Sequence, residues 1–531
     1  MKKLTAILLA ILMLIPLIVS CGGNDETTTT EAPTTETPTT EAPTTEIPTT
    51  ETPTTEAPTT EAPTTEAPTT EIPTTEAPTT IDPNVPWSSK TDIRDTWSGK
   101  TLNIACTSWY GSSSHMGIPE LCVKEGEESK FGVKIDTAVL ERNEYIEDTY
   151  GVKLNFIIAT KENMPDALEK AALAENINYD LCMPRMMNAQ EIVVGGHLYD
   201  LANREFIDFR NSYYSENSVK TYTAHERTFF VNGSFSLVDK ELALVLFFNK
   251  NLLGDGSKEA SDELYQLVRD GKWTYDKLIS YASAVYSDNG DANDPYRYTR
   301  GAHFLSYARF YDYFGVKQAG VDTATGKWEI TLNDDKVDNI INTVINSKKS
   351  AWFDEGLQFG AYSYKISFAE NTLLFADNQF YIYPGYDCDY VGVIPFPMLN
   401  EEQGGYYVPT HYQLTVLMCI PKITQDRAMS EYFMDVLCWT GEEYTMKAYL
   451  ETKKEHFKAD VDMEMITDYI IPNISYDVGG IVGNSELLPN VKSNSWQDGE
   501  NKFDEFYASA EPNALKTIAE WNAAWGGYTE E

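Results

Sequence analysis

A repetitive segment near the N-terminus constrains the fold of this 531-residue chain more than any other feature. Over residues 31–80 the sequence repeats Glu-(Ala/Thr/Ile)-Pro-Thr-Thr with a five-residue period. The segment has almost no apolar side chains, so it cannot bury a core. Regular prolines favour polyproline II and the repeated glutamates repel one another, which predicts a semi-stiff spacer. The composition is equally typical of mucin-like stalks with glycosylated threonines. Glycosylation would coat the segment with sugar, and the segment would still act as a spacer.

The residues before the spacer have the layout of a secretory signal peptide. Two lysines precede an apolar run over residues 4–19, and Cys21 directly follows Ser20. This pattern resembles a bacterial lipobox, which predicts cleavage before Cys21 and lipid attachment to it. The alternative is an ordinary signal peptide with an incidental cysteine. The lipobox interpretation implies a chain anchored to the cell membrane on its extracytoplasmic face.

Three parts therefore follow one another along the chain: a signal peptide over 1–20, a lipid-anchored spacer over 21–89 and a folded region over 90–531. The folded region is long enough for two lobes with separate cores. The chain has a formal net charge of −40, and the acidic excess continues beyond the spacer. Nucleic acids and other polyanions are therefore poor candidates as partners.

The cysteines beyond Cys21 indicate buried positions. Four of them lie within apolar runs, namely Cys106, Cys182, Cys419 and Cys438. Cysteines in such runs are usually small buried hydrophobic residues. Because no Cys-x-x-Cys pair or compact cysteine framework is present, we predict no obligatory disulfide.

Short β-rich runs alternate with stretches of helical spacing. The predicted strands are 101–106, 152–158, 179–183, 242–248, 391–396 and 414–420. The clearest helix covers 426–439, where Met429, Tyr432, Phe433, Val436 and Leu437 fall on one face. Ser261 and Thr274 are predicted to cap two further helices. This alternation predicts α/β lobes with largely buried sheets.

The region beyond the spacer also resembles the extracellular solute-binding proteins of ABC transporters, in the sugar-binding branch related to maltose-binding protein. The resemblance depends on short segments in the family's order: Arg142-Asn143, Tyr150-Gly151-Val152, Tyr179-Asp180-Leu181, Gly196-His197-Leu198-Tyr199-Asp200-Leu201, Phe247-Phe248-Asn249-Lys250, Gly271-Lys272-Trp273-Thr274-Tyr275-Asp276, Gly392-Val393-Ile394-Pro395-Phe396-Pro397, Gln403, Tyr406-Tyr407 and Ile420-Pro421. Each segment is weak by itself, and their collinear order carries the resemblance.

The resemblance implies a periplasmic-binding-protein-like fold of type II, with two lobes joined by hinge crossings around a cleft. Lobe 1 would cover approximately 97–243 and 405–445, and lobe 2 approximately 244–404 and 446–531. It also implies a binding protein without a cofactor or catalytic residues, which captures a saccharide by lobe closure and presents it to the permease subunits of an ABC transporter.

Several residues are candidates for contacting the ligand. Trp109 and Tyr110 follow the first predicted strand, and loops at the carboxyl ends of strands line the clefts of open α/β sheets. An aromatic ring there could stack on the apolar face of a sugar. Arg185 lies beyond the strand ending at residue 183, and its donors suit paired hydroxyls or a uronate carboxylate. Surface ion pairing is the alternative for Arg185, and packing within the loop is the alternative for the aromatic pair. Three further candidates lie near the crossings: Asn232, Tyr386 and His411.

The run Asp288-Asn289-Gly290-Asp291-Ala292-Asn293-Asp294 gathers oxygen ligands around a glycine. Relatives in the family often carry a fuller loop at this point that resembles a calcium site. An EF-hand would need a glutamate at its twelfth position, where this chain has Thr299 or Ala302 depending on the starting aspartate. We therefore predict an Asx-rich turn and no metal site.

Two other classes of function remain open. The sequence contains no His-Glu-x-x-His, no Gly-x-Ser-x-Gly and no phosphate-binding glycine loop. A carboxylate pair for glycoside hydrolysis depends on spatial separation, so an extracellular carbohydrate-active enzyme is one alternative. The spacer by itself would also suit a stalked surface adhesin.

Overall fold

The computed structural model describes residues 94–107, 132–160, 164–174, 177–256, 258–294, 297–304, 310–332, 334–353, 366–381, 390–411, 414–478 and 500–530. The chain divides into two units, Met1–Ala77 and Pro78–Glu531, and the described residues all belong to the second. The predicted signal peptide, Cys21 and the spacer lie outside the described residues, as do Trp109, Tyr110 and Tyr386. Within the described ranges, no helix has the length and apolar character needed to cross a membrane.

The first sheet contains three parallel strands in the order β2-β1-β3, with β1 at Thr101–Thr107, β2 at Lys153–Thr160 and β3 at Leu181–Met183. Helices provide the crossovers that parallel strands require: α3 (Val133–Tyr150) follows β1, and α4 (Met164–Leu173) follows β2. Leu102 and Ile104 of β1 have no exposed surface, and they pack in one cluster with Phe433 of a later helix, α13 (Arg427–Thr440). This sheet confirms three of the predicted strands.

The second sheet has five strands in the order β12-β6-β11-β8-β7. The strands are β6 (Leu244–Asn249), β7 (Ser287–Asp288), β8 (Tyr298–Phe304), β11 (Leu373–Gln379) and β12 (Val391–Ile394). β11 runs parallel to β8, whereas β6 is antiparallel to both β11 and β12. One face of this sheet packs in a cluster that includes Phe248, Trp273 and Phe396 and is completed by helices α8 (Lys258–Arg269), α9 (Tyr275–Val285) and α11 (Asp334–Lys348).

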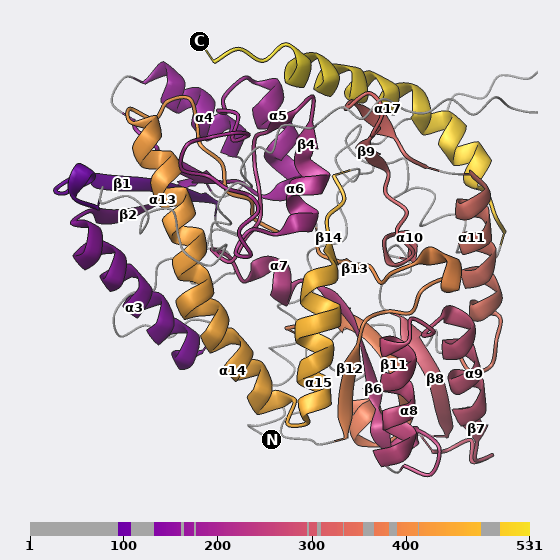
Figure 1. The fold of residues 1–531 in the computed structure, drawn as a ribbon. Coiled ribbons are helices and arrows are strands. Elements are labelled where there is room, and N and C mark those ends of the chain that lie inside the picture. The colour runs from indigo at the N-terminus through magenta and orange to yellow at the C-terminus, as the bar shows by residue number, and fades with distance from the viewer. Residues whose placement is uncertain are drawn as a thin grey trace, which may run out of the picture. The chain divides into compact units, whose positions relative to one another are not determined.

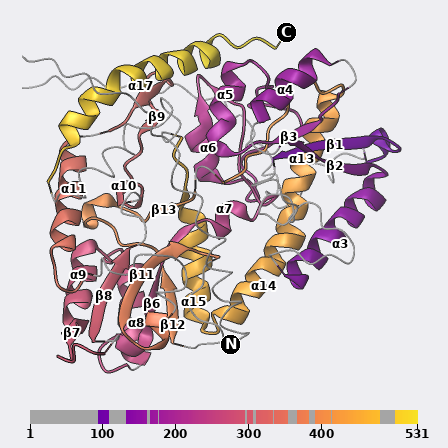
Figure 2. The ribbon, with the colours of Figure 1, turned by 180° about the vertical axis from the view of Figure 1, so that it is seen from behind.

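The chain passes between the two sheets at α7 (Val238–Glu241), which leads directly into β6. It returns after β12 through β13 (Val408–Pro409), which pairs in parallel with β14 (Ile474–Ser475). Figures 1 and 2 show this return segment and α7 between the two sheets. One face of each sheet packs in a cluster of its own, and a third cluster joins Ala105 and Cys182 of the first sheet with Phe247 of the second. Two sheets joined by chain crossings confirm the predicted α/β fold class.

The predicted strand 414–420 is wrong as a regular strand. Residues of this segment form isolated antiparallel bridges, which pair Val416 with Arg185 and Cys419 with Cys182. Met418 bridges Val231 instead, so the segment alternates between two partners along its length. A continuous ladder with a single neighbour is therefore not formed, and the pairing depends on long-range partners that periodicity does not reveal.

Helix α13 confirms the predicted helix and its buried face. Asp426 caps the helix, since its Oδ1 accepts a hydrogen bond from the Met429 backbone N–H at 3.0 Å. The five apolar residues predicted to share one face are all buried. The helix continues through the π-helical turn η6 (Gly441–Met446) into α14 (Lys447–His456), and α15 (Asp460–Glu464) continues into a second π-helical turn, η7 (Met465–Ile470).

Of the two other predicted caps, Thr274 is confirmed in position only and Ser261 is wrong. Thr274 occupies the N-cap position of α9, although its side chain makes no capping hydrogen bond. Helix α8 begins earlier, at Lys258, so Ser261 lies inside the helix with 4% of its surface exposed. Ser261 cannot cap because it lies on the buried face of this helix together with Leu264 and Val268.

The C-terminal helix α17 (Phe503–Gly526) packs against elements of both predicted lobes, since it contacts α5 (Ala189–Val194) and β10 (Trp328–Ile330). Trp525 has no exposed surface and lies edge-on to Trp328, with ring centroids 5.4 Å apart. The Asn522 amide also bonds both the N–H and the C=O of Trp328, each at 2.9 Å. The segment 446–531 is therefore not confined to lobe 2. Figure 1 shows α17 beside α5 and β9.

The remaining short elements connect these parts. They are η1 (Arg94–Trp97), η2 (Met186–Asn188), α6 (Glu216–Tyr222), β4 (Thr223–Ala224), β5 (Arg227–Thr228), η3 (Lys250–Leu252), α10 (Phe310–Tyr313), β9 (Ala319–Val321), η5 (Glu401–Gln403) and η8 (Ile471–Asn473).

Candidate ligand-binding pocket

A cavity of about 630 Å³ opens beside α7, where the chain leaves the first sheet. Four segments form its wall: the loop before α6, the turn and helix over 233–240, the π-helical turn η6 and the segment over 471–476. The lining residues are Phe209, Arg210, Asn211, Ser212, Tyr213, Tyr214, Ser215, Glu216, Gly233, Ser234, Asp239, Lys240, Glu442, Met446, Ile471, Pro472, Ile474 and Tyr476. The volume lies within the usual range for small-molecule sites, about 300–1,000 Å³.

Aromatic rings form one side of this pocket. The Phe209 ring lies edge-on to that of Tyr214, with centroids 5.1 Å apart. Tyr213 and Tyr214 are almost fully buried, whereas Phe209 keeps part of its surface exposed. Phe209 is therefore the aromatic side chain of this wall that is best placed to offer an apolar surface to a ligand.

The two tyrosines are held from behind by a carboxylate on α13. The Tyr214 hydroxyl donates to Asp435 Oδ1 at 3.0 Å, and the Tyr213 hydroxyl lies 3.0 Å from both carboxylate oxygens. Burial is the largest cause that raises the pKa of both tyrosines, and the Asp435 charge adds to it. Both hydroxyls therefore stay protonated at neutral pH and keep donating to Asp435.

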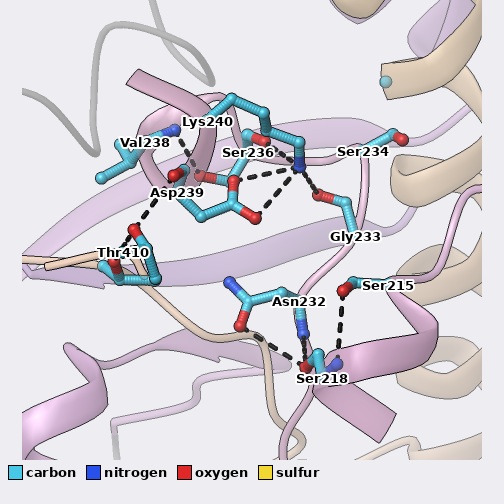
Figure 3. Close-up of polar contacts among 12 residues, drawn as sticks. Ser215, Ser218, Asn232, Gly233, Ser234, Ser236, Val238, Asp239, Lys240 and Thr410 are labelled. Atoms are coloured by element: carbon cyan, nitrogen blue, oxygen red, sulfur yellow. Dashed lines mark hydrogen bonds and ion pairs between the residues drawn. The ribbon is translucent and has the colours of Figure 1, made fainter. Parts of the chain in front are cut away.

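A buried ion pair on α7 also lines the pocket, and Figure 3 shows its polar contacts. Lys240 and Asp239 are neighbours on α7 with exposed fractions of 6% and 1%, and Lys240 Nζ lies 3.0 Å from Asp239 Oδ1. Lys240 Nζ also donates to the backbone oxygens of Gly233 at 3.1 Å and Ser236 at 3.0 Å. With three acceptors around it, the ammonium group is fully hydrogen-bonded within the protein.

Asp239 connects this pocket to the return crossing. Its Oδ2 accepts a hydrogen bond from the Tyr476 hydroxyl at 2.7 Å, and its backbone oxygen accepts one from Thr410 Oγ1 at 3.0 Å. Thr410 in turn lies 2.9 Å from Thr415 through their hydroxyls. Asp239, which lines the pocket, therefore also holds the residues that directly follow β13 and β14.

Most of the charge around the pocket is neutralised by the protein. Four of the five charged lining residues are in ion pairs. Arg210 binds Asp208 through two hydrogen bonds of 2.6 Å and 2.8 Å, and Glu216 pairs with Lys220 at 2.6 Å. The fifth, Glu442, accepts a hydrogen bond from the hydroxyl of Ser234. Such a pocket suits a ligand that brings hydroxyl groups rather than charge.

The structure places the predicted contact residue Asn232 beneath the pocket wall, where it has no exposed surface (Figure 3). Its Nδ2 donates to the Val416 backbone oxygen at 2.7 Å, and its backbone N–H donates to Ser218 Oγ at 2.7 Å. The Asn232 amide therefore holds the wall in place, and a ligand contact from this residue stays a prediction.

Two other predicted residues lie in described parts of the chain, away from this pocket's lining. Arg185 is half-buried and pairs with Val416 through a backbone bridge. His411 is half-buried, and its backbone oxygen accepts from the N–H groups of Leu414 and Thr415. The structure therefore does not bring Arg185 and His411 together with Phe209.

The sequence contained a signal for this pocket that the predictions did not use. The run Phe-Arg-Asn-Ser-Tyr-Tyr over 209–214 interleaves aromatic and polar residues outside any predicted helix or strand. Such composition in a loop is typical of binding surfaces. Tyr476 carried no comparable signal, because only the tertiary fold brings it to Asp239.

A second cavity of about 420 Å³ lies beside α8 and includes Lys250, Tyr265 and Tyr390. Lys250 Nζ binds Asp462 Oδ2 at 2.7 Å, and the Tyr265 hydroxyl bonds the other oxygen of the same carboxylate. Burial raises the pKa of Asp462 despite these partners. Lys250 and Tyr265 of this cavity are thus both engaged with the Asp462 carboxylate.

The run over 288–294 forms the predicted Asx-rich turn. Backbone N–H groups two residues onward donate to the side chains of Asp288, Asn289 and Asp291 at 2.8–2.9 Å. Arg297 donates to both oxygens of Asp288, at 2.6 Å and 2.7 Å, and lowers the pKa of that carboxyl to about 2. Within the described parts of the chain, no group of three or more His, Cys, Asp or Glu side chains is arranged to hold a metal ion.

No protein-family model and no curated protein matches the sequence. Among solved structures, the chain is similar to a cyclo/maltodextrin-binding protein in complex with maltotetraose, at 14% identity and a TM-score of 0.49, over 79% of this chain and 96% of that one. It is similar to maltose-bound T. maritima MalE3 at 14% identity and a TM-score of 0.43, over 79% and 99%. A third is a family 1 extracellular solute-binding protein from Bifidobacterium longum subsp. infantis, at 12% identity and a TM-score of 0.44, over 81% and 100%.

Proposed function

We propose that this chain is an extracytoplasmic solute-binding lipoprotein that captures a neutral saccharide for uptake by an ABC transporter. The observation that carries the proposal is the 630 Å³ pocket, which combines a partly exposed aromatic ring with hydroxyl groups and internally paired charges. The sequence resemblance to sugar-binding solute-binding proteins supports it independently.

The chemistry of the pocket fits a sugar better than an ion or a lipid. A pyranose ring has an apolar C–H face, which Phe209 can contact, and hydroxyls that need donors and acceptors. Ser212, Ser215 and Glu442 provide such groups on the lining. A lipid would leave these polar groups desolvated, and an anion would find the nearest ammonium, Lys240, already bonded to three oxygens.

Binding would be coupled to lobe closure through α7. This helix carries the pocket residues Asp239 and Lys240 and continues directly into β6, the first crossing. Asp239 is also bonded to the segments of the return crossing. A ligand that contacts both sides of such a junction shifts the balance between open and closed forms by its differential affinity for them.

The predicted residues Trp109, Tyr110, Arg185, Tyr386 and His411 belong to this proposal as contacts from elsewhere around the binding cleft. Lipid attachment at Cys21 and the spacer would keep the domain near its permease without restricting closure. The proposal assigns no catalytic step. Replacing Cys21 by Ser should release the protein from the membrane fraction, and full retention would exclude the lipid anchor.

The proposal is tested by a thermal-shift screen of neutral mono- and oligosaccharides against the soluble chain beginning after the spacer. A ligand that binds only the folded form raises the melting temperature, and the shift grows with the logarithm of the ligand concentration above Kd. Uronates of the same size are the matched controls and should give smaller shifts. Release of cleaved product would favour a carbohydrate-active enzyme. The absence of any response to saccharides would favour the stalked surface adhesin.

A further inference from the structure

Two buried cysteines of the first lobe face each other across an isolated antiparallel bridge. Cys182 on β3 and Cys419 on the return segment form an antiparallel bridge. Each backbone N–H donates to the other's backbone oxygen, at 2.9 Å and 3.0 Å. The two residues are 237 positions apart in sequence, and neither has exposed surface.

Both thiols are free in this structure, and their backbone pairing is compatible with a disulfide. Directly opposed residues of a hydrogen-bonded antiparallel pair have Cα atoms about 5.5 Å apart, within the range of about 4.4–6.8 Å found for disulfides. Opposed side chains project from the same face, and both cysteines belong to the same hydrophobic cluster. Cys419 Sγ also contacts the Cys182 backbone oxygen at 3.5 Å, so the thiol already points toward its partner.

The neighbouring Cys106 is excluded as a competitor by register. On β1, Ala105 is the partner of Cys182, whereas Cys106 is the partner of Met183. Side chains alternate across a strand, so Cys106 projects from the opposite face of the sheet to Cys182. It accordingly packs in a different hydrophobic cluster.

We propose that Cys182 and Cys419 form a disulfide when the exported chain folds in the presence of a disulfide oxidant, either a small molecule or an oxidoreductase. One cysteine thiolate attacks the oxidant's disulfide, which releases one reduced thiol and leaves a mixed disulfide. The second cysteine, after losing its proton, attacks the sulfur of the first and expels the other oxidant thiol. The two thiol protons and the two electrons pass to the oxidant, which leaves as two thiols.

The bond would form during folding and not afterwards. In the folded chain, burial and the neighbouring Cys419 raise the pKa of Cys182, which leaves little thiolate, and both sulfurs are inaccessible to the oxidant. The bond would fasten the two parts of the first lobe to each other. It would leave the crossings at α7 and β13 free to move, so it is compatible with lobe closure.

The test refolds the full chain from the reduced, denatured state, once in a mixed glutathione buffer and once in excess reductant. Thiols are then alkylated under acid denaturation, and unreduced peptides are mapped by mass spectrometry. We expect a peptide pair linking Cys182 to Cys419, lighter by two hydrogen atoms, only in the glutathione sample. The melting temperature of that sample should be higher by about 5–10 °C.

Recovery of both cysteines in alkylated form, or linked to other cysteines, would overturn the proposal. The matched variants are Cys419→Ala, which should lose both the linked peptide and the temperature difference, and Cys438→Ala, which should keep both. If Cys419→Ala fails to fold, the peptide map of the unmodified sequence still decides. None of these outcomes depends on the ligand, so the proposed function is tested separately.

Discussion

Tyr476 donates its hydroxyl hydrogen to Asp239 Oδ2 across 2.7 Å, and this contact joins the segment after β14 to α7. Asp239 is simultaneously paired with Lys240, which binds the turn at Gly233 and Ser236. One buried carboxylate thus holds together the pocket wall and the outgoing and returning crossings. Changes at this carboxylate or its partners should therefore affect stability and ligand response together.

Replacing Tyr476 by Phe should lower the free energy of unfolding by about 1.5–3 kcal/mol, because it removes a hydrogen bond to a charged acceptor in a buried site. Burial raises the pKa of Tyr476, so the hydroxyl stays protonated and the loss should be equal at pH 6 and pH 8. Urea unfolding measures the change. The control is Tyr444→Phe at a less buried ring, expected to be within 0.5 kcal/mol.

Replacing Lys240 by Met should cost about 3–5 kcal/mol, since it leaves the buried Asp239 carboxylate without its charged partner. The control is Lys220→Met, which breaks the exposed pair with Glu216. That pair should contribute less than about 1 kcal/mol. Equal effects of the two variants in urea unfolding would show that the Lys240 ion pair is not structurally important.

The Arg269–Glu464 pair should make stability depend on pH. Two hydrogen bonds of 2.7 Å and 2.6 Å connect them, and Arg269 lowers the pKa of Glu464 below its ordinary value of 4.5. A carboxyl group whose pKa is lowered by folding stabilises the folded state at any pH above its unfolded-state pKa. This stabilisation disappears as the pH falls through the lower pKa of the folded state. Because a third of each side chain is exposed, the contribution should be only about 0.5 kcal/mol.

The measurement compares Glu464→Gln with the unmodified chain by urea unfolding at several pH values. The two proteins should differ at pH 7 and converge as the pH falls below 4.5 through the lowered pKa. A difference that persists undiminished to the acidic end would mean that packing, not charge, distinguishes them.

The 288–294 turn should need no calcium. The Arg297 guanidinium occupies both oxygens of Asp288, which a metal would require. Adding a chelator should therefore leave the melting temperature unchanged. In an NMR titration, the Asp288 pKa of about 2 should rise toward its ordinary value in Arg297→Ala. A melting temperature that falls on chelation would contradict this interpretation.

Local patterns predicted the elements whose stability is local. The helix over 426–439 follows from its apolar face and the Asp426 cap, and the Asx turn at 288–294 follows from its own side chains. The bridges at Val416 and Cys419 could not be predicted, since their partners are distant in sequence. Ser261 is wrong as a cap because α8 begins at Lys258, about one turn before Ser261.

The pocket was the least predictable part, because its wall joins four segments that only the tertiary fold assembles. The family resemblance predicts ligand contacts in the loops after the first sheet's strands, at Trp109 and Arg185. Phe209 and Tyr476 lie outside those loops. Asn232 was chosen for its position near a crossing, and its complete burial could be recognised only from the packing around it.

We expect the pocket to bind a saccharide against Phe209, and isothermal titration of the best ligand from the screen tests this contact. Phe209→Ala should weaken binding by roughly 10- to 100-fold, corresponding to loss of an aromatic contact of about 1–3 kcal/mol. The control Leu515→Ala, at a half-exposed residue of α17, should leave Kd unchanged. The melting temperature without ligand should also change little in Phe209→Ala, because the ring is only partly buried. An unchanged Kd in Phe209→Ala would contradict the claim.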